Sequence, residues 1–305
     1  MAKIVFFGTP EIALSILKKI HKSRHKLLAV YSQPPKKSLR GQKLNKSVVH
    51  EFAEQNLLNI KTPVNLENEE NFLKVSAPDI AIVVAYGKII PKKILKLPKH
   101  GFINIHTSLL PKYRGAAPIQ RSLINQDKET GISIMKIIDK LDAGPIYKKY
   151  KISIKENESY SSLLSRLTNL AEENIIENIE NIIQNKIEFK SQNENEASYA
   201  KKIKKKDGKI DWDESAELIR AKVNALTPNP GAWFIFKNER YKILNAEVVS
   251  NQGKPGQVIS EDLIVGCGNK SLKIIKIQRQ GKNPQNSKEF LLGSKIRLGV
   301  NLSHE

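Results

Sequence analysis

The chain has 305 residues, 40% of them hydrophobic and 27% charged, so it carries enough apolar side chains to fold and wholesale disorder is excluded. Its 51 basic and 31 acidic residues give a net charge of +20, which favours a polyanionic partner such as nucleic acid but does not by itself establish one. Its one cysteine, Cys267, excludes an internal disulfide and a paired-cysteine zinc site, and its short apolar segments predict a cytoplasmic protein with no membrane partner.

The first half of the chain alternates apolar runs, typical of buried strands, with amphipathic helical patterns. Strands are predicted at residues 4–7, 27–31, 79–85 and 102–105. The first strand leads into a predicted helix, which Thr9 would cap and whose first turn Pro10 would occupy. Strands separated by helices predict an α/β domain with a mostly parallel sheet, in which catalytic groups lie beyond the carboxyl ends of the strands.

The second half begins with a predicted helix and then changes in character. Apolar residues recur at three-to-four spacing across residues 159–184, which predicts a long helix packed on the sheet. A polar stretch and a run of lysines follow it. Short strand patterns then come at 233–236, 241–249, 257–260, 263–267 and 272–277. Their spacing predicts a small β-barrel or sandwich.

These changes in character predict two domains joined by a linker. We expect a first domain at residues 1–186, a basic linker at 187–206 and a β domain at 207–305. The first domain has 30 basic and 17 acidic residues, so it carries +13 of the net charge of +20. We therefore expect most of the attraction for a polyanion to come from the first domain and the linker.

Two common nucleotide-binding patterns are missing from the sequence. The turn after the first predicted strand contains Gly8, where a dinucleotide-binding fold would have three spaced glycines, and no P-loop pattern occurs. An NAD-dependent oxidoreductase and a P-loop NTPase are therefore disfavoured.

Three polar residues are candidates for catalysis. Asn104 and His106 are two apart on a predicted strand, so their side chains point to the same face. Asp142 lies in a turn after another apolar run, and a carboxylate near an imidazole fixes its tautomer and favours its charged form. Taken singly, each residue also has an ordinary structural explanation: a backbone-satisfying amide, a half-buried histidine and a turn former.

The surrounding motifs resemble those of the folate-dependent formyltransferase family. The strand carries Asn104-Ile-His106-x-Ser108-Leu-Leu-Pro111, followed by Arg114-Gly-Ala-Ala-Pro-Ile-Gln120 and later by Leu141-Asp142-x-Gly144. Ile210-Asp-Trp212 and Pro228-x-Pro230-Gly-Ala-Trp233 extend the resemblance into the second domain, to the members that act on methionyl-tRNA. The resemblance covers nearly the whole chain.

This resemblance implies a fold, a reaction and a set of residues. The fold would be a Rossmann-like formyltransferase domain with a mostly parallel sheet and an OB-like β-barrel domain that contacts tRNA. The reaction would transfer the formyl group of 10-formyltetrahydrofolate to the amine of methionine on initiator tRNA. Asn104, His106 and Asp142 match the family's catalytic positions. The folate-binding segment would be Ser108, Leu109, Leu110 and Pro111, with no metal, and we expect a monomer without an obligate protein partner.

The tRNA would be bound by two groups of basic residues. The loop between residues 33 and 51 contains five cations and no acid: Lys36, Lys37, Arg40, Lys43 and Lys46. Long loops between a strand and a helix are often functional, and Arg40 matches the family's stem-contacting arginine. In the linker, Lys204, Lys205 and Lys206 would either contact phosphates or be merely solvated.

Other functions stay open at this point. A formyltransferase acting on a small amine, such as a ribonucleotide or an amino sugar, is opposed by the second domain and the basic loop. A catalytically silent RNA-binding protein is opposed by the intact Asn104, His106 and Asp142 set. A hydrolase that uses the same three residues to attack formylfolate with water is a third alternative.

Overall fold

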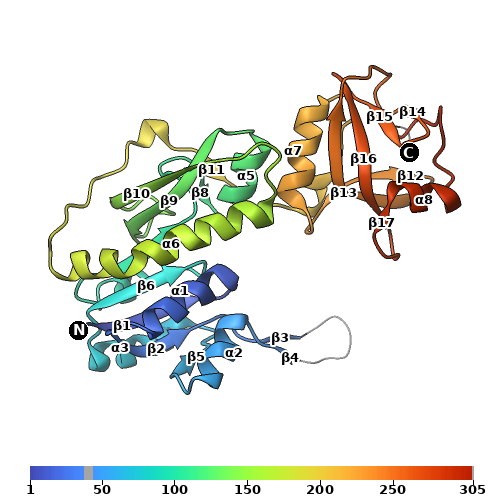
Figure 1. Cartoon of the computed structure of the whole chain (residues 1–305). Coiled ribbons are helices and arrows are strands. Elements are labelled where there is room, and N and C mark those ends of the chain that lie inside the picture. The colour runs from blue at the N-terminus through green and yellow to red at the C-terminus, as the bar shows by residue number, and fades with distance from the viewer. Residues whose placement is uncertain (38–43, 304–305) are drawn as a thin grey trace. The chain divides into compact units, whose positions relative to one another are not determined.

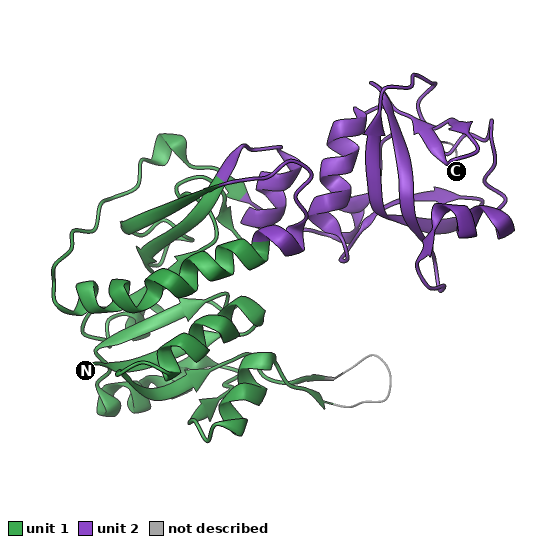
Figure 2. Ribbon diagram, viewed as in Figure 1, with its two compact units in different colours: residues 1–115, 130–152, 164–199 green, residues 116–129, 153–163, 200–305 purple. Residues whose placement is uncertain are grey.

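The computed structural model describes residues 1–37 and 44–303, and this part of the chain divides into two compact units (Figure 2). Unit 1 comprises Met1–Gly115, Thr130–Ile152 and Leu164–Tyr199. Unit 2 comprises Ala116–Glu129, Ser153–Leu163 and Ala200–Glu305. The stretch 116–129 joins unit 2 because it contains α5 (Pro118–Ile124), which contacts α7 (Ala216–Leu226). The domain boundaries expected at residues 186 and 206 stay a prediction.

Among the described residues, seven strands form the main sheet of unit 1, in the order β10-β9-β7-β6-β1-β2-β5 (Figure 1). They are β1 (Lys3–Gly8), β2 (Lys26–Tyr31), β5 (Ile60–Lys61), β6 (Ile80–Val84), β7 (Phe102–His106), β9 (Glu129–Lys136) and β10 (Ile146–Ser153). The pairs β1–β2, β1–β6, β2–β5 and β6–β7 are parallel, whereas β7 and β9 are antiparallel. The predicted mostly parallel sheet is confirmed.

The central strands of this sheet are buried along their length. All of β6, and β1 from Ile4 to Gly8, is buried, as expected for a parallel strand covered on both faces. On one face Phe7 stacks on Tyr31, with ring centroids 4.3 Å apart, and Phe102 contributes to the same core. β7 therefore starts in an apolar core and ends at the polar residue His106.

The helices of unit 1 follow the amphipathic patterns of the sequence. They are α1 (Glu11–His21), α2 (Val48–Gln55), α3 (Glu70–Ser76), α4 (Lys92–Leu95) and most of α6 (Tyr160–Ile183), whose start up to Leu163 belongs to unit 2, with 3-10 turns η1 (Leu66–Glu69) and η2 (Glu194–Glu196). Two short ladders complete the unit: β3 (Lys36–Lys37) with β4 (Leu44–Asn45), and β8 (Arg114–Gly115) with β11 (Tyr199–Ala200). The long helix predicted at 159–184 is confirmed.

The prediction that Thr9 caps the first helix is wrong. The helix begins one residue later than expected, at Glu11, and its cap residue is Pro10, which has no side chain that can accept a hydrogen bond. The Thr9 hydroxyl instead donates to the carbonyl of Tyr86, at 3.1 Å. Thr9 therefore ties the end of β1 to the segment that follows β6.

Unit 2 is built around an antiparallel sheet, whose strands lie where the short strand patterns of the sequence predict a small β domain. Its strands are β12 (Ala232–Phe236), β13 (Glu239–Val249), β16 (Ser271–Arg279), β15 (Ile264–Gly266) and β14 (Val258–Ser260), in that order, with β17 (Gln285–Asn286) paired to β16. The 3-10 turn η3 (Lys205–Gly208) and α8 (Ser287–Gly293) also belong to it. Its core contains Trp212, Phe234 and Tyr241, which are in ring contact. Closure of this sheet into an OB-like barrel stays a prediction.

Within residues 1–37 and 44–303, no helix combines the length and the apolarity needed to cross a membrane.

Candidate active site

β7 places Asn104 and His106 on one face of the main sheet. In the register of the sheet, Asn104 is paired with Val83 of β6 and Met135 of β9, and His106 with Ser133 of β9. Alternation along the strand turns both polar side chains to the face that carries Phe102. The predicted shared face is therefore present, next to the end of β9.

His106 is held between a backbone carbonyl and a carboxylate. Its side chain is buried, with 7% exposed. Nε2 lies 2.9 Å from the carbonyl oxygen of Tyr113, and because a carbonyl only accepts, Nε2 carries the proton. Nδ1 lies 3.7 Å from Oδ2 of Asp142. The structure thus brings together two residues that are 36 positions apart in the sequence.

The turn that carries Asp142 is tightly constrained. Asp142 adopts a left-handed backbone conformation, with φ of 45°, which aspartate tolerates better than most residues. Its Oδ2 accepts a hydrogen bond from the backbone N–H of Gly115, at 2.8 Å. Two residues on, a Cβ on Gly144 would lie 1.8 Å from the carbonyl oxygen of Lys136, so the turn passes too close to the end of β9 for any other residue.

Asn104 has an available side chain. It is half-buried, and nothing in the described ranges forms a hydrogen bond with its amide group. Its amide is not one of the fully buried polar atoms that lack a partner, so solvent or a ligand can reach it. Its N–H groups are thus available to a substrate oxygen next to His106.

The predicted folate-binding segment is a loop anchored to β9. The Ser133 hydroxyl donates to the carbonyl of Ser108 at 2.7 Å and accepts from the N–H of Leu110 at 3.0 Å. The Ser108 hydroxyl itself donates to the carbonyl of Lys112. Ser108, Leu110 and Pro111 are buried and Leu109 is half-buried. Hydrogen bonds therefore attach the loop to β9, and Leu109 is the most exposed of its four residues.

A cluster that sequence reasoning missed lies behind Asp142. Arg114 is completely buried, and its guanidinium donates to Oε1 of Gln192 and to both carboxylate oxygens of Glu194. The guanidinium, followed by the ammonium of Lys140, lowers the pKa of Glu194 to about 2. Gln192 and Glu194 belong to a stretch expected to be a plain linker, and no periodicity marked them.

The predicted tRNA-binding residues lie in two separate segments. Lys36 and Lys37 form β3, whereas Arg40 and Lys43 lie outside the described residues. Lys46 forms an ion pair with Glu54 of α2, at 2.6 Å, so an acid from outside the loop partly neutralises it. In unit 2, the side chains of Lys204, Lys205 and Lys206 are exposed.

The second segment has a defined backbone. The N–H of Lys204 donates to the carboxylate of Asp207, and the indole of Trp233 donates to the carbonyl of Lys205, at 2.8 Å. Lys205 and Lys206 therefore lie in a hydrogen-bonded 3-10 turn, with Lys204 at its N-cap position.

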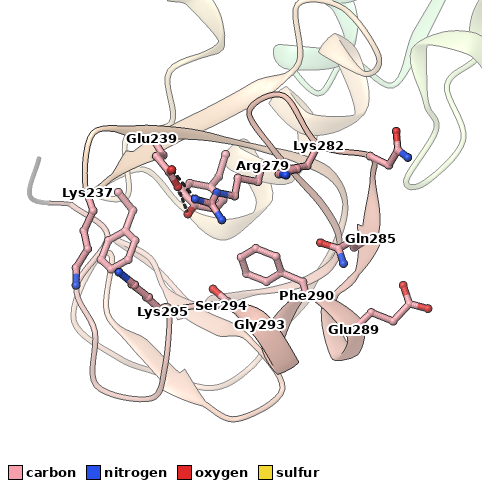
Figure 3. Close-up of a pocket in the computed structure, with 13 residues that line it drawn as sticks. Lys237, Glu239, Arg279, Lys282, Gln285, Glu289, Phe290, Gly293, Ser294 and Lys295 are labelled. Atoms are coloured by element: carbon pink, nitrogen blue, oxygen red, sulfur yellow. Dashed lines mark hydrogen bonds and ion pairs between the residues drawn. The ribbon is translucent and has the colours of Figure 1, made fainter.

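A pocket in unit 2 contains none of the predicted catalytic residues (Figure 3). Arg279 and Glu239 form an ion pair there, and the hydroxyl of Tyr241 donates to Glu239 at 3.0 Å. These contacts, with Arg279 the stronger, lower the pKa of Glu239. The polar groups of this pair therefore satisfy one another, and Lys282, Glu289 and Lys295 also line the pocket.

Two family models match the chain over most of its length. The model described as formyl transferase matches residues 2–179, and the formyl transferase C-terminal domain matches residues 202–295. The chain belongs to the formyl transferase family. The first match contains Asn104, His106 and Asp142, and the second begins just before Lys204.

Similar proteins are found by sequence and by structure. The chain is 54% identical to the methionyl-tRNA formyltransferase of Pelagibacter ubique and 43% identical to that of Thermodesulfovibrio yellowstonii, over 99% and 97% of both chains respectively. A solved structure of WlaRD, a sugar 3N-formyltransferase in the presence of dTDP and 5-N-formyl-THF, has a TM-score of 0.69 and 22% identity, covering 93% of this chain and 99% of that one. This last likeness shows the shared fold.

Proposed function

We propose that the protein transfers the formyl group of 10-formyltetrahydrofolate to the α-amine of methionine esterified to initiator tRNA, giving N-formylmethionyl-tRNA for translation initiation. The observation that carries the proposal is the pair formed by the buried His106 and the half-buried Asp142, 3.7 Å apart, in a chain that matches methionyl-tRNA formyltransferases over nearly its whole length. The substrate places the reaction in the cytoplasm, where we expect the protein to act as a monomer.

In this proposal the reaction passes through a tetrahedral intermediate. The free amine attacks the formyl carbon, a C–N bond forms and the carbonyl oxygen becomes negative. The bond from that carbon to N10 of the folate then breaks, and the proton lost by the amine ends on N10. Donors placed at the developing oxyanion contribute roughly 3–4 kcal/mol each.

The three side chains take complementary parts in this reaction. The unpartnered amide of Asn104 donates to the oxyanion. His106 donates as well, from Nδ1, which faces Asp142, or from Nε2 once it exchanges the carbonyl of Tyr113 for the substrate. Asp142 stabilises the positive charge on His106 and relays the proton from the amine towards the leaving nitrogen.

The folate and the tRNA would bind at different places. The loop from Ser108 to Pro111 follows the catalytic strand directly, so a folate held there presents its formyl group to Asn104 and His106. WlaRD, which shares the fold, was crystallised with a formylated folate, which is consistent with this assignment. The lysines of β3 and η3 would bind the phosphates of the tRNA.

The decisive experiment is a product assay. The purified protein is incubated with 10-formyltetrahydrofolate and methionyl-tRNA, and the aminoacyl ester is examined for a blocked amine. We expect formylmethionyl-tRNA to accumulate and free methionine or amino sugars to remain unmodified. Formylation of a small amine in place of methionyl-tRNA, or folate consumption without any amine, would refute the proposal.

A charge variant tests the tRNA side. Replacing Lys204, Lys205 and Lys206 with glutamine removes three exposed cations, so KM for methionyl-tRNA should rise while kcat changes little. The plot of log affinity against log salt should become shallower by about 0.7–0.9 for each phosphate that the variant no longer neutralises. The matched control replaces three exposed lysines of unit 1, Lys19, Lys22 and Lys26, with glutamine. Equal effects in both triple variants would mean that net charge, and not these positions, attracts the tRNA.

A further inference from the structure

The side-chain amide of Gln192 connects the two backbone segments that contact the catalytic pair. Its Nε2 donates to the carbonyl of Asp142, at 2.8 Å, and to the carbonyl of Gly144, at 2.7 Å. Its Oε1 accepts from Nε and Nη2 of Arg114, at 3.1 and 2.8 Å. Both ends of the amide are thus engaged, and the orientation of the group is fixed by the chemistry of its partners.

Arg114 lies between the two residues whose backbones meet the catalytic side chains. Its predecessor, Tyr113, offers the carbonyl that binds His106, and its successor, Gly115, offers the N–H that binds Asp142. The N–H of Arg114 donates to the carbonyl of Ser198, at 2.8 Å. A shift of the Arg114 side chain would therefore move the backbone groups that hold both catalytic residues.

The Asp142 turn needs such support. The left-handed backbone of Asp142, although aspartate tolerates it better than most residues, still costs conformational energy that surrounding contacts offset. Gln192 supplies two of those contacts, directly to the carbonyls that flank the turn. The segment that carries Gln192 is itself attached to β10 through paired hydrogen bonds between Lys190 and Ile146, each 2.8 Å.

We propose that Gln192 is a positioning residue for catalysis: it holds the Asp142 turn against Arg114, so that the carboxylate of Asp142 faces Nδ1 of His106. The proposal rests on the proposed formyl transfer, in which Asp142 acts. In the described part of the chain, Gln192 forms no hydrogen bond with His106 or with the Asp142 carboxylate, so its effect passes through the backbone of the turn.

Two variants remove the donors of Gln192 in different ways. Gln192→Glu keeps the size of the side chain and an acceptor for Arg114 but removes both donors to the turn, and Gln192→Met removes all polar contacts. Either change should lower kcat about 10- to 100-fold, because small misplacements of a catalytic group have effects of that order. KM for both substrates should change less than about threefold, since the residues assigned to substrate binding are unchanged.

A double-variant cycle separates positioning from general stability. In an Asp142→Asn background, which tolerates the left-handed turn, Gln192→Glu should lower single-turnover rates less than about twofold, because the carboxylate that Gln192 positions is already gone. The control Gln184→Met, at an exposed glutamine of the same unit, should leave kcat unchanged. Thermal melting shows whether each variant is folded. If Gln192→Met does not fold, the kinetic test is made with Gln192→Glu alone.

The outcomes are distinct. Wild-type protein that fails to formylate methionyl-tRNA overturns the proposed function. Given an active wild type, a folded Gln192→Glu variant with wild-type kcat overturns the positioning proposal. The proposal is also overturned if Gln192→Glu lowers the single-turnover rate by the same factor in the wild-type and Asp142→Asn backgrounds, because an equal factor indicates a purely structural role.

Discussion

Unit 1 buries a polar cluster in addition to its apolar core, whereas the main core of unit 2 is apolar. Around the end of β7, unit 1 buries His106, Ser108 and Arg114, and each of these forms hydrogen bonds to the loops around it. The core of unit 2 is instead apolar and aromatic, with Phe234 stacked on Tyr241 at a centroid distance of 5.5 Å.

The difference indicates that the polar cluster serves the reaction, whereas the apolar core of unit 2 serves stability. A buried polar group is costly unless it is paired, and its pairing specifies one geometry, so a polar cluster is retained where geometry matters. An apolar core supplies stability without directional demands. We therefore expect substitutions in the polar cluster of unit 1 to act on rate, and substitutions in the core of unit 2 to act on folding.

The largest expected effect is on the rate, at His106. Replacing His106 with Ala should lower kcat by about 10²- to 10⁴-fold, since the variant lacks both the proton-transferring group and a donor to the oxyanion. KM for methionyl-tRNA should stay near the wild-type value. Steady-state kinetics with each substrate varied in turn measures both constants.

The matched control for this variant is His21→Ala, because His21 is exposed at the end of α1. Its kinetics should resemble those of the wild type. A loss of less than tenfold in kcat for His106→Ala would remove His106 from the chemistry.

The next effect is on stability, in unit 2. Replacing Phe234 with Ala should lower the free energy of unfolding by about 3–5 kcal/mol, because the ring is buried against Trp212 and Tyr241. Both tryptophans of the chain, Trp212 and Trp233, belong to unit 2, so their fluorescence during urea denaturation follows this unit. The urea concentration at the midpoint of unfolding should fall, while kcat of the folded protein at low temperature should change little.

Leu292→Ala is the control in the same unit, since Leu292 is 88% exposed. It should alter the free energy of unfolding by less than about 0.5 kcal/mol. A large fall in kcat for folded Phe234→Ala protein would contradict the expectation that the core of unit 2 affects folding and not the reaction rate.

The fold could be predicted from the sequence where the apolar pattern is strong. Continuous apolar runs marked β1 and β6, because a strand that is covered on both faces leaves that trace. Short strand patterns at the spacing of a small β domain marked β12 and β13. The cap of α1 was mistaken because a tertiary contact, Thr9 to Tyr86, replaced a local one.

The candidate site was predictable in part. The motifs around Asn104, His106 and Asp142 pointed to chemistry, but the contacts that orient them could not be found in the same way. Gln192 lies 50 residues from Asp142, in a polar stretch without periodicity, so its role arises only when the chain folds. A buried arginine requires partners, yet nothing in the sequence shows that Arg114 is buried.

The smallest expected effect is a pH-dependent change in stability at the edge of the polar cluster. Arg114, and after it Lys140, lower the pKa of Glu194 from about 4.5 to about 2, so the folded state holds the carboxylate charged. A depressed carboxylate pKa stabilises the folded state fully above pH 4.5, and the stabilisation is lost as the pH falls towards 2. Glu194→Gln should therefore melt a few degrees below the wild type at pH 6, and the gap should close between pH 4.5 and pH 2.

Circular dichroism melts at half-unit steps of pH measure this gap, with the exposed Glu188→Gln as the control that should show no such closure. Because Glu194 is half-exposed, water and salt screen its pair with Arg114, and added salt should narrow the gap at pH 6. Gln192 keeps its bonds to Arg114 in this variant, so kcat should fall far less than in Gln192→Glu. If the difference in melting temperature between the wild type and Glu194→Gln did not depend on pH, the charge of Glu194 would not be what stabilises the folded state. An equal loss of kcat in Glu194→Gln and Gln192→Glu would mean that the whole cluster, and not Gln192, positions Asp142.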